Sequence, residues 1–354
     1  MTVDVLAHVK ALSSPPGLSG YEEPARTVIR SAWEPLTDEQ HADRLGTYWA
    51  VRRGQGAPPR PRLMLAAHMD AIGLMVTRRE GEFLRVANIG GIDPRVLPGQ
   101  LVTVHGRQDL PAVVVAPPPF LLPKAKRDNV TPLAELLVDT GLPAERLAQL
   151  AHTGDLVSFA QPPVELLNEQ LAAKSLDNRA SVAALTVCLE ALQGRPLVWD
   201  VYAVATVQEE VGLRGAGTSA YSLQPDLAVA VDVTYGSDAA TREFAHRTFP
   251  LGGGPALGLG PNIHAGLFAA FKACAARAEI PYTIEAMPGH SGTDAFAIQV
   301  ARAGIPTMVL SIPVRNMHTP VEVVALKDIA RTGRLLAEFA ASLDDQFMAG
   351  LTLD

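Results

Sequence analysis

The chain has 354 residues, of which 48% are hydrophobic and 19% charged, and this composition excludes a mainly disordered protein. A net charge of −7 provides no basic footprint for nucleic acid, and no segment resembles a signal peptide, a membrane span or a basic amphipathic helix. The two cysteines, Cys188 and Cys274, are too few for a disulfide framework, so we expect a cytoplasmic protein without nucleic-acid or membrane partners.

The first segment of the chain predicts two helices and one buried strand. The helices cover residues 3–12 and 22–33, with a loop over residues 13–20 between them. An apolar run at residues 62–67 then leads into His68, which is the pattern of a buried strand that ends in a polar site.

Short β-type runs punctuated by Gly and Pro follow, and they are typical of a small all-β unit. The expected strands are residues 73–77, 83–87, 101–105, 112–115 and 156–159. Small helices are expected at residues 132–139 and 143–151. We therefore predict a small β-barrel-like domain over residues 71–163.

After this unit, apolar strands alternate with helices, which indicates a mostly parallel sheet covered on both faces. The expected strands are residues 198–207, 227–231 and 307–312, and the expected helices are residues 178–192, 262–279, 293–303 and 327–343. The predicted fold class is α/β, with a mixed, mostly parallel sheet sandwiched by helices. Residues 1–70 and 164–354 would form this domain, and the β-rich unit would be inserted into it.

Ionisable residues stand at or beside the ends of the predicted strands. They are His68, Asp70, Asp177, Glu209, Glu210, Asp232 and His318. Taken one at a time, most have an ordinary structural interpretation, because a His-x-Asp pair can close a turn and an Asp can cap a helix. Taken together they are more specific, since functional sites of α/β folds collect at the carboxyl ends of the strands.

The adjacent glutamates Glu209 and Glu210 carry the most information. Neighbouring side chains of an extended segment point to opposite sides, so one can bind a metal while the other faces the substrate as a base. Two carboxylates directly after the apolar run 198–207 are costly unless something pairs with them. The alternative is a pair of solvated loop glutamates.

The combination of two histidines with several carboxylates is a mixed nitrogen and oxygen donor set. Such sets suit Zn²⁺, Co²⁺ or Mn²⁺. Two cations at about 3.5–4 Å need a carboxylate that bridges them, and Asp177 is the candidate for that role.

These residues belong to motifs that run through nearly the whole chain and resemble the tetrahedral (TET) aminopeptidases, which include glutamyl, lysyl and leucyl aminopeptidases. The motifs are Ala67-His68-Met69-Asp70-Ala71-Ile72-Gly73, Gly90-Gly91-Ile92-Asp93-Pro94, Lys174-Ser175-Leu176-Asp177-Asn178-Arg179, Gln208-Glu209-Glu210-Val211-Gly212, Val231-Asp232-Val233, Ser291-Gly292-Thr293-Asp294-Ala295 and Asn316-Met317-His318-Thr319-Pro320. The resemblance implies the zinc-peptidase fold, which is phosphorylase/hydrolase-like.

The resemblance also implies a ligand set for two divalent metal ions, with zinc, cobalt or manganese as candidates. One metal would take His68 and Asp232, the other would take Glu210 and His318, and Asp177 would bridge them.

The remaining two residues would act beside the metals. Glu209 would be the general base, and Asp70 would orient His68. The inserted β-rich domain would form dimers, and dimers would assemble into a hollow tetrahedral dodecamer. The implied substrates are short peptides that lose their N-terminal residues.

Two positions depart from the family pattern, Ala71 where Glu is usual and Asn316 where Tyr is usual. Neither is an expected ligand, so the departures concern rate and substrate preference. Some members of the family were labelled cellulases, but a glycosidase pair of bare carboxylates would not need the histidines.

Two other functions fit the same residues. A deacylase that acts on small N-acyl compounds could use the same metal site, and acetylated substrates would separate it from an aminopeptidase. A non-catalytic scaffold is disfavoured, because loss of a site residue would have indicated it and none is lost.

Overall fold

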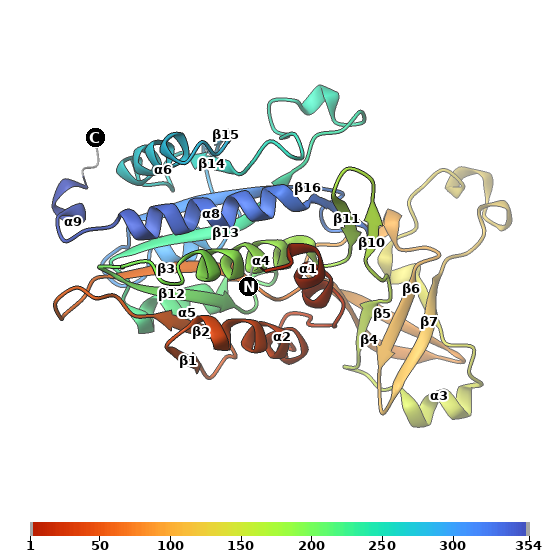
Figure 1. Ribbon diagram of the computed structural model, residues 1–354. Coiled ribbons are helices and arrows are strands. Elements are labelled where there is room, and N and C mark those ends of the chain that lie inside the picture. The colour runs from red at the N-terminus through yellow and green to blue at the C-terminus, as the bar shows by residue number, and fades with distance from the viewer. Residues whose placement is uncertain (1–2, 352–354) are drawn as a thin grey trace.

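The computed structural model describes residues 3–351, which form an α/β sandwich with a β-barrel beside it (Figure 1). The α-helices are α1 (Val5–Ser13), α2 (Glu23–Trp33), α3 (Ala144–Leu150), α4 (Leu176–Ala191), α5 (Arg214–Leu223), α6 (Ala265–Arg277), α7 (Ala295–Gln299), α8 (Leu326–Ser342) and α9 (Phe347–Gly350). Short 3₁₀ turns are η1 (Glu34–Leu36), η2 (Pro94–Val96), η3 (Pro119–Leu121), η4 (Lys124–Lys126), η5 (Leu133–Glu135) and η6 (Arg242–Phe244). None of the described helices is both long and apolar enough to cross a bilayer.

The large sheet has a parallel centre and antiparallel edges. Its strands follow the order β1-β2-β12-β3-β13-β16-β17-β11-β10, and β14 and β15 join at β16. Their bounds are β1 (Glu39–Ala42), β2 (Tyr48–Arg52), β3 (Arg62–His68), β10 (Val164–Leu166), β11 (Gln170–Ala173), β12 (Asp200–Thr206), β13 (Leu227–Tyr235), β14 (Ala256–Leu259), β15 (Thr283–Ala286), β16 (Thr307–Arg315) and β17 (Glu322–Ala325). The central strands β12, β3, β13 and β16 are parallel to their neighbours in this group, so their carboxyl ends share one edge.

Both faces of the large sheet are covered by helices, which is why its central strands are apolar throughout. On one face, α4 and α8 pack together over the sheet, and α1, α2 and α6 extend that layer (Figure 1). On the other face, α5 and α7 enclose a smaller core that includes Met64, Val204 and Ile298. The predicted α/β sandwich is therefore confirmed.

The β-barrel is closed by six antiparallel strands in the order β4-β5-β8-β7-β6-β9. These are β4 (Gly73–Glu80), β5 (Phe83–Ile89), β6 (Leu101–His105), β7 (Asp109–Val115), β8 (Leu137–Asp139) and β9 (Leu156–Phe159). Inward-facing aliphatic side chains such as Leu74, Val104 and Val138 fill it, and α3 packs its buried Leu147 against them. The expected small barrel is therefore present, with a core separate from that of the sandwich.

Several predicted elements differ from the structure. The helix expected at residues 132–139 is wrong, because only Leu133–Glu135 turns and Leu137–Asp139 is strand β8. Val138 faces the barrel core between β5 and β7, so tertiary pairing overrides the local helical preference. The helix expected at residues 293–303 is shorter in the structure, where α7 covers only Ala295–Gln299.

Other differences concern short edge elements and strand ends. The sequence analysis did not predict the short strands β1, β2, β10, β11, β14, β15 and β17 or helix α5, because short runs carry little periodic signal. Strand β13 continues three residues past Asp232 to Tyr235, so this aspartate lies inside the strand and not at its end as expected.

A buried cation fixes the loop after α1 to the end of β3. The guanidinium of Arg179, which is 0% exposed, donates from Nη1 to the carbonyls of Leu12 and Pro15 at 2.8 and 2.7 Å. Its Nη2 donates to the carbonyl of Gly17 at 3.3 Å and its Nε to that of Met69 at 3.2 Å. This side chain of α4 therefore joins the end of α1 and the loop after it to the residue that follows β3.

Burial is the main influence on this guanidinium and lowers the pKa of Arg179 to about 10, so it remains charged at neutral pH. The nearby carboxylates of Asp70, Glu22 and Glu322 act in the opposite direction. Since Met69 lies between His68 and Asp70, Arg179 holds in place the strand end that carries both residues.

Replacing Arg179 by Met should therefore destabilise the protein strongly. Several buried carbonyls would lose their donors and three carboxylates would lose a buried positive charge, so we expect a loss of about 3–5 kcal/mol. Urea unfolding of the variant measures it. The control is Arg79→Met on the exposed part of β4, which should change stability by less than about 0.5 kcal/mol. Equal unfolding curves for the two variants would contradict this role.

Candidate metal centre

The carboxyl edge of the parallel strands brings together the ionisable residues predicted from the sequence. His68 ends β3, Glu209 and Glu210 follow β12, Asp232 lies near the end of β13, His318 follows β16, and Asp177 lies at the start of α4. Asp177 and Asn178 have non-helical torsions, so the regular helix begins after them and the Asp177 carboxylate is free to face the sheet edge. Residues far apart in sequence thus converge on one point.

Asp177 lies between the two histidines. Its Oδ1 is 3.2 Å from Nε2 of His68, and its Oδ2 is 3.2 Å from Nε2 of His318. On one side, Oδ1 of Asp232 lies 3.7 Å from the same nitrogen of His68. On the other side, Oε2 of Glu210 lies 3.6 Å from Nε2 of His318. The result is two clusters that share the carboxylate of Asp177. Within each cluster, the atoms that could bind a metal lie within 4.8 Å of one another.

Glu209 lies next to these clusters. Its Oε2 is 3.8 Å from Nε2 of His68, and it lines the same cavity of about 360 Å³ as the metal-type ligands. Glu209 also forms a third group with His68 and Glu210. Of the two adjacent glutamates, Glu210 belongs to the cluster that contains His318, and Glu209 lies beside His68.

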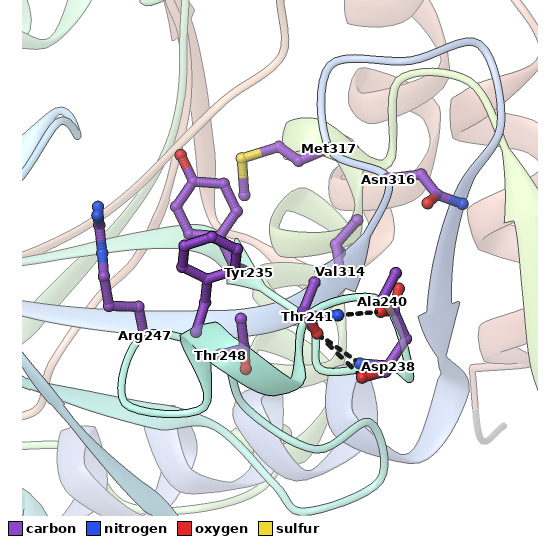
Figure 2. Close-up of a pocket in the computed structure, with 11 residues that line it drawn as sticks. Tyr235, Asp238, Ala240, Thr241, Arg247, Thr248, Val314, Asn316 and Met317 are labelled. Atoms are coloured by element: carbon purple, nitrogen blue, oxygen red, sulfur yellow. Dashed lines mark hydrogen bonds between the residues drawn. The ribbon is translucent and has the colours of Figure 1, made fainter.

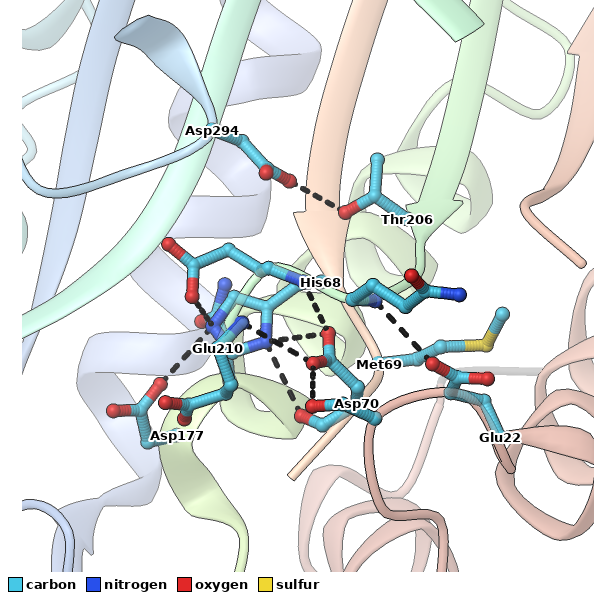
Figure 3. A network of polar contacts seen from close by, with 12 residues as sticks. Glu22, His68, Met69, Asp70, Asp177, Thr206, Glu210 and Asp294 are labelled. Carbon is cyan, nitrogen blue, oxygen red and sulfur yellow. Dashed lines mark hydrogen bonds and ion pairs between the residues drawn. The ribbon is translucent and has the colours of Figure 1, made fainter. Parts of the chain in front are cut away.

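Asp70 is completely buried and organises the turn that carries the two glutamates (Figure 3). It accepts hydrogen bonds from the backbone N–H groups of Glu209 and Glu210 at 3.0 and 3.2 Å and from Oγ of Ser19 at 2.6 Å. Its Oδ1 also lies 3.4 Å from Nδ1 of His68. One carboxylate thus contacts the backbone of both glutamates and the ring of the histidine.

The sequence analysis missed Glu322, which holds the backbone of two candidate ligands, as Asp70 holds the backbone of the two glutamates. One of its oxygens accepts the backbone N–H of Asp177 and the other that of His318, each at 3.0 Å. Glu322 is 1% exposed. A glutamate at the start of the short strand β17 gives no local signal of this role, because its partners are 145 and 4 residues away.

Several residues beside the candidate ligands have a strained backbone conformation. Ser175, Gln208, Asn316 and His318 all have positive φ angles between 56° and 61°. This left-handed conformation is unfavourable for residues with a Cβ and is often found at functional sites, where surrounding contacts hold it. Each of the four residues lies at or within two positions of a candidate ligand.

The barrel also reaches this site through two glycines that follow β5. A Cβ on Gly91 would lie 3.1 Å from Nδ1 of His318, and one on Gly90 would lie 3.2 Å from Oε2 of Glu210. Gly90 has φ +75° in addition. Glycine is therefore required here because the chain passes directly beside two of the candidate ligands.

Burial dominates the electrostatics of the site. It raises the pKa of Glu209 to about 9 and that of Glu210 to about 8, and it raises the pKa of Asp232 well above its usual range. Hydrogen bonding to Asp177 raises the pKa of His318 to about 9. No Lys or Arg lines this cavity among the described residues, so its carboxylates have only the imidazoles of His68 and His318 as cationic partners.

This donor set fits divalent cations. Carboxylate oxygens and imidazole nitrogens are ligands of zinc, cobalt and manganese, and two positive ions would compensate the buried anions that the protein leaves unbalanced. Asp177 belongs to both clusters, and a ligand that bridges two metal ions requires this position.

The two positions that depart from the family pattern lie outside the metal-type clusters. Ala71 is buried, and its N–H donates to the carbonyl of Gly17. Asn316 lines a separate pocket of about 520 Å³ together with Tyr235, Arg247 and Met317 (Figure 2). Since Tyr235 and Met317 also line the metal-type cavity, this pocket borders it.

Known proteins resemble this chain over nearly its full length. A family model described as M42 glutamyl aminopeptidase matches residues 46–335. The lysyl aminopeptidase of Pyrococcus furiosus is 34% identical over 334 residues, which cover 92% of this chain and 94% of that protein.

Solved structures resemble it equally closely. A TET aminopeptidase from a marine sediment Thaumarchaeota archaeon matches with a TM-score of 0.91 at 30% identity, over 98% of this chain and 99% of that one. The Pyrococcus horikoshii TET1 peptidase, which can assemble into a tetrahedron or a large octahedral shell, matches with a TM-score of 0.83 at 30% identity, over 96% and 100%.

Proposed function

The chain belongs to the M42 glutamyl aminopeptidase family, and on that premise we propose that it removes N-terminal residues from short peptides with two divalent cations. The observation that carries the proposal is the position of Asp177, whose two oxygens each face a different histidine at 3.2 Å. Zinc, cobalt and manganese all suit the donors, and the free, buried cysteines are compatible with a cytoplasmic enzyme.

We assign the candidate ligands as two sets with one shared member. His68 and Asp232 would hold one cation, Glu210 and His318 would hold the other, and Asp177 would bridge them. When bound, the two cations would polarise the scissile carbonyl, lower the pKa of the attacking water and offset the anions that raise the pKa of Glu209.

Glu209 is the proposed general base. Its Oε2 would take a proton from the water as the oxygen attacks the peptide carbonyl carbon, and it would deliver that proton to the leaving amine as the carbon–nitrogen bond breaks. Asp70 would be a positioning residue, because it accepts hydrogen bonds from the backbone of Glu209 and lies beside the ring of His68.

Assembly into a larger particle is part of the proposal. The barrel exposes Leu101 and, on the long connection between β7 and β8, Phe120 and Leu121, which are 66%, 72% and 72% exposed. Exposed apolar side chains of this kind are commonly covered by a partner subunit. We propose that the barrel makes dimers and that dimers form a tetrahedral dodecamer.

Removal of metal should abolish hydrolysis of an aminoacyl substrate, and added Zn²⁺, Co²⁺ or Mn²⁺ should restore it. Asp177→Asn should lower the content of both ions because the shared ligand is weakened. Elemental analysis of the purified proteins measures this. Asp345→Asn, an exposed carboxylate near the C-terminus, is the matched control and should keep its metal. Full activity of protein with no detectable metal would refute the two-metal proposal.

The two adjacent glutamates should respond differently to the same substitution. Glu209→Gln should retain metal and lose about 10²–10⁴-fold in kcat, since the base is removed and the ligands are intact. Glu210→Gln should lose metal as well as activity. Kinetics and metal analysis of both variants decide the assignment, and the reverse pattern would mean that their roles are exchanged.

A free α-amino group should be essential in the substrate. We expect leucine p-nitroanilide or a short peptide to be cleaved and its N-acetylated form to resist cleavage, as measured by release of product under identical conditions. Equal cleavage of both forms would favour an endopeptidase, and preferential hydrolysis of the acetyl group itself would favour the deacylase alternative.

Light scattering at micromolar concentration should give the mass of a dodecamer, with dimers at high dilution. Phe120→Glu combined with Leu121→Glu should reduce the mass, because charged groups would enter the proposed contact. Glu82→Gln, on the exposed turn between β4 and β5, is the control. A monomeric mass for the unaltered protein would contradict the assembly while leaving the chemistry intact.

A further inference from the structure

The cavity beside the candidate metal centre contains one carboxylate that the proposed hydrolysis does not use. Glu285, on the edge strand β15, lines this cavity of about 360 Å³ and also an adjoining cavity of about 550 Å³. It is neither a candidate ligand nor the proposed base. Its charge therefore requires an explanation of its own.

Glu285 has few partners for a carboxylate at such a position. Its Oε1 accepts a hydrogen bond from Oγ1 of Thr234 at 2.7 Å, while its Oε2 is shielded from solvent and the only other hydroxyl near the carboxylate is that of Ser311. Among residues 3–351 no Lys, Arg or His forms an ion pair with it. Burial raises its pKa, which indicates that the anion is poorly stabilised by the protein alone.

The position of Glu285 relative to the metal-type ligands follows from strand geometry. Its partner Thr234 lies two residues beyond Asp232 on β13, so their side chains share one face about 7 Å apart along the strand. A lysine or arginine side chain spans about this distance from its Cα. A substrate whose first carbonyl lies at the metal centre would thus bring such a side chain close to Glu285.

The surroundings of Glu285 suit a long apolar stem with a charged end. Met287 lies two residues away on the same side and lines both cavities, so it offers a flexible apolar contact for the methylenes. The Ser311 hydroxyl also lines the inner cavity and lies near the Glu285 carboxylate. Arg247 lines the outer cavity, and no Lys or Arg of the described residues lines the inner one.

We propose that Glu285 determines specificity by receiving the cationic side chain of an N-terminal lysine or arginine, so that the preferred substrates are peptides that begin with a basic residue. The inference rests on the proposed aminopeptidase function. It assigns the α-amino group to the carboxylates next to the metals, because that group lies one bond from the Cα adjacent to the scissile carbonyl.

The experiment compares substrates that differ in one charge. Lysine and norleucine p-nitroanilides have side chains of similar length and shape, and only lysine carries the ammonium group. With metal-loaded unaltered protein, kcat/KM for lysine should exceed that for norleucine by about ten-fold or more. Glu285→Gln keeps the size of the side chain and should reduce this ratio to about one, mainly through a higher KM for lysine.

Glu82→Gln is the matched control, since it removes the same charge from an exposed turn far along the chain and should leave the ratio unchanged. An unchanged ratio in Glu285→Gln would overturn the proposal. An equal loss on both substrates would overturn it too, because it would indicate that Glu285 binds the α-amino group or only supports the fold.

The test also separates this inference from the function on which it rests. Hydrolysis of norleucine and leucine substrates without preference for lysine would refute the basic preference and leave the aminopeptidase intact. Absence of hydrolysis for every free aminoacyl substrate, with both metals bound, would refute the proposed function and the specificity together.

Discussion

The burial of many carboxylates at one edge of the sheet is the constraint on which the rest of this structure depends. Asp70, Asp177, Glu209, Glu210, Asp232, Asp294 and Glu322 all lie at or beside the carboxyl ends of the parallel strands, and most are almost inaccessible to solvent. Anions removed from water are strongly destabilising unless hydrogen bonds or cations compensate them. The local architecture consists largely of such compensation.

Part of the compensation comes from the protein itself. Asp70 and Glu322 accept backbone N–H groups of the segments that carry the candidate ligands. Asp294 accepts the hydroxyl of Thr206 (Figure 3). Arg179 adds a buried positive charge and ties the loop after α1 to the end of β3. These contacts hold the backbone, and they leave the carboxylates that face the cavity with only two histidines to offset their charge, a condition that favours binding of divalent cations.

The barrel and the sandwich have separate cores, yet the site depends on both. Gly90 and Gly91 bring the barrel chain against Glu210 and His318, so a rotation of the barrel relative to the sandwich would disturb two candidate ligands of the same cluster. The barrel and the long connection between β7 and β8 also expose apolar residues. The inserted unit therefore has one surface that completes the site and another that is available to a partner.

The sequence alone determined the α/β sandwich, the inserted barrel and the family, because long apolar strands and seven ordered motifs are properties of local sequence. It also singled out the seven candidate site residues, since each lies in one of those motifs. Its errors were local: residues 137–139 form a strand because Val138 is needed between two barrel strands, and short edge strands have too few residues to show a period. Only the tertiary structure revealed that Arg179 and Glu322 bind distant backbone groups and that Glu285 lines the cavity beside the candidate metal centre. Their roles depend on which groups become neighbours after burial, and an isolated charged residue in a sequence does not specify whether water, a backbone N–H or a ligand will balance its charge.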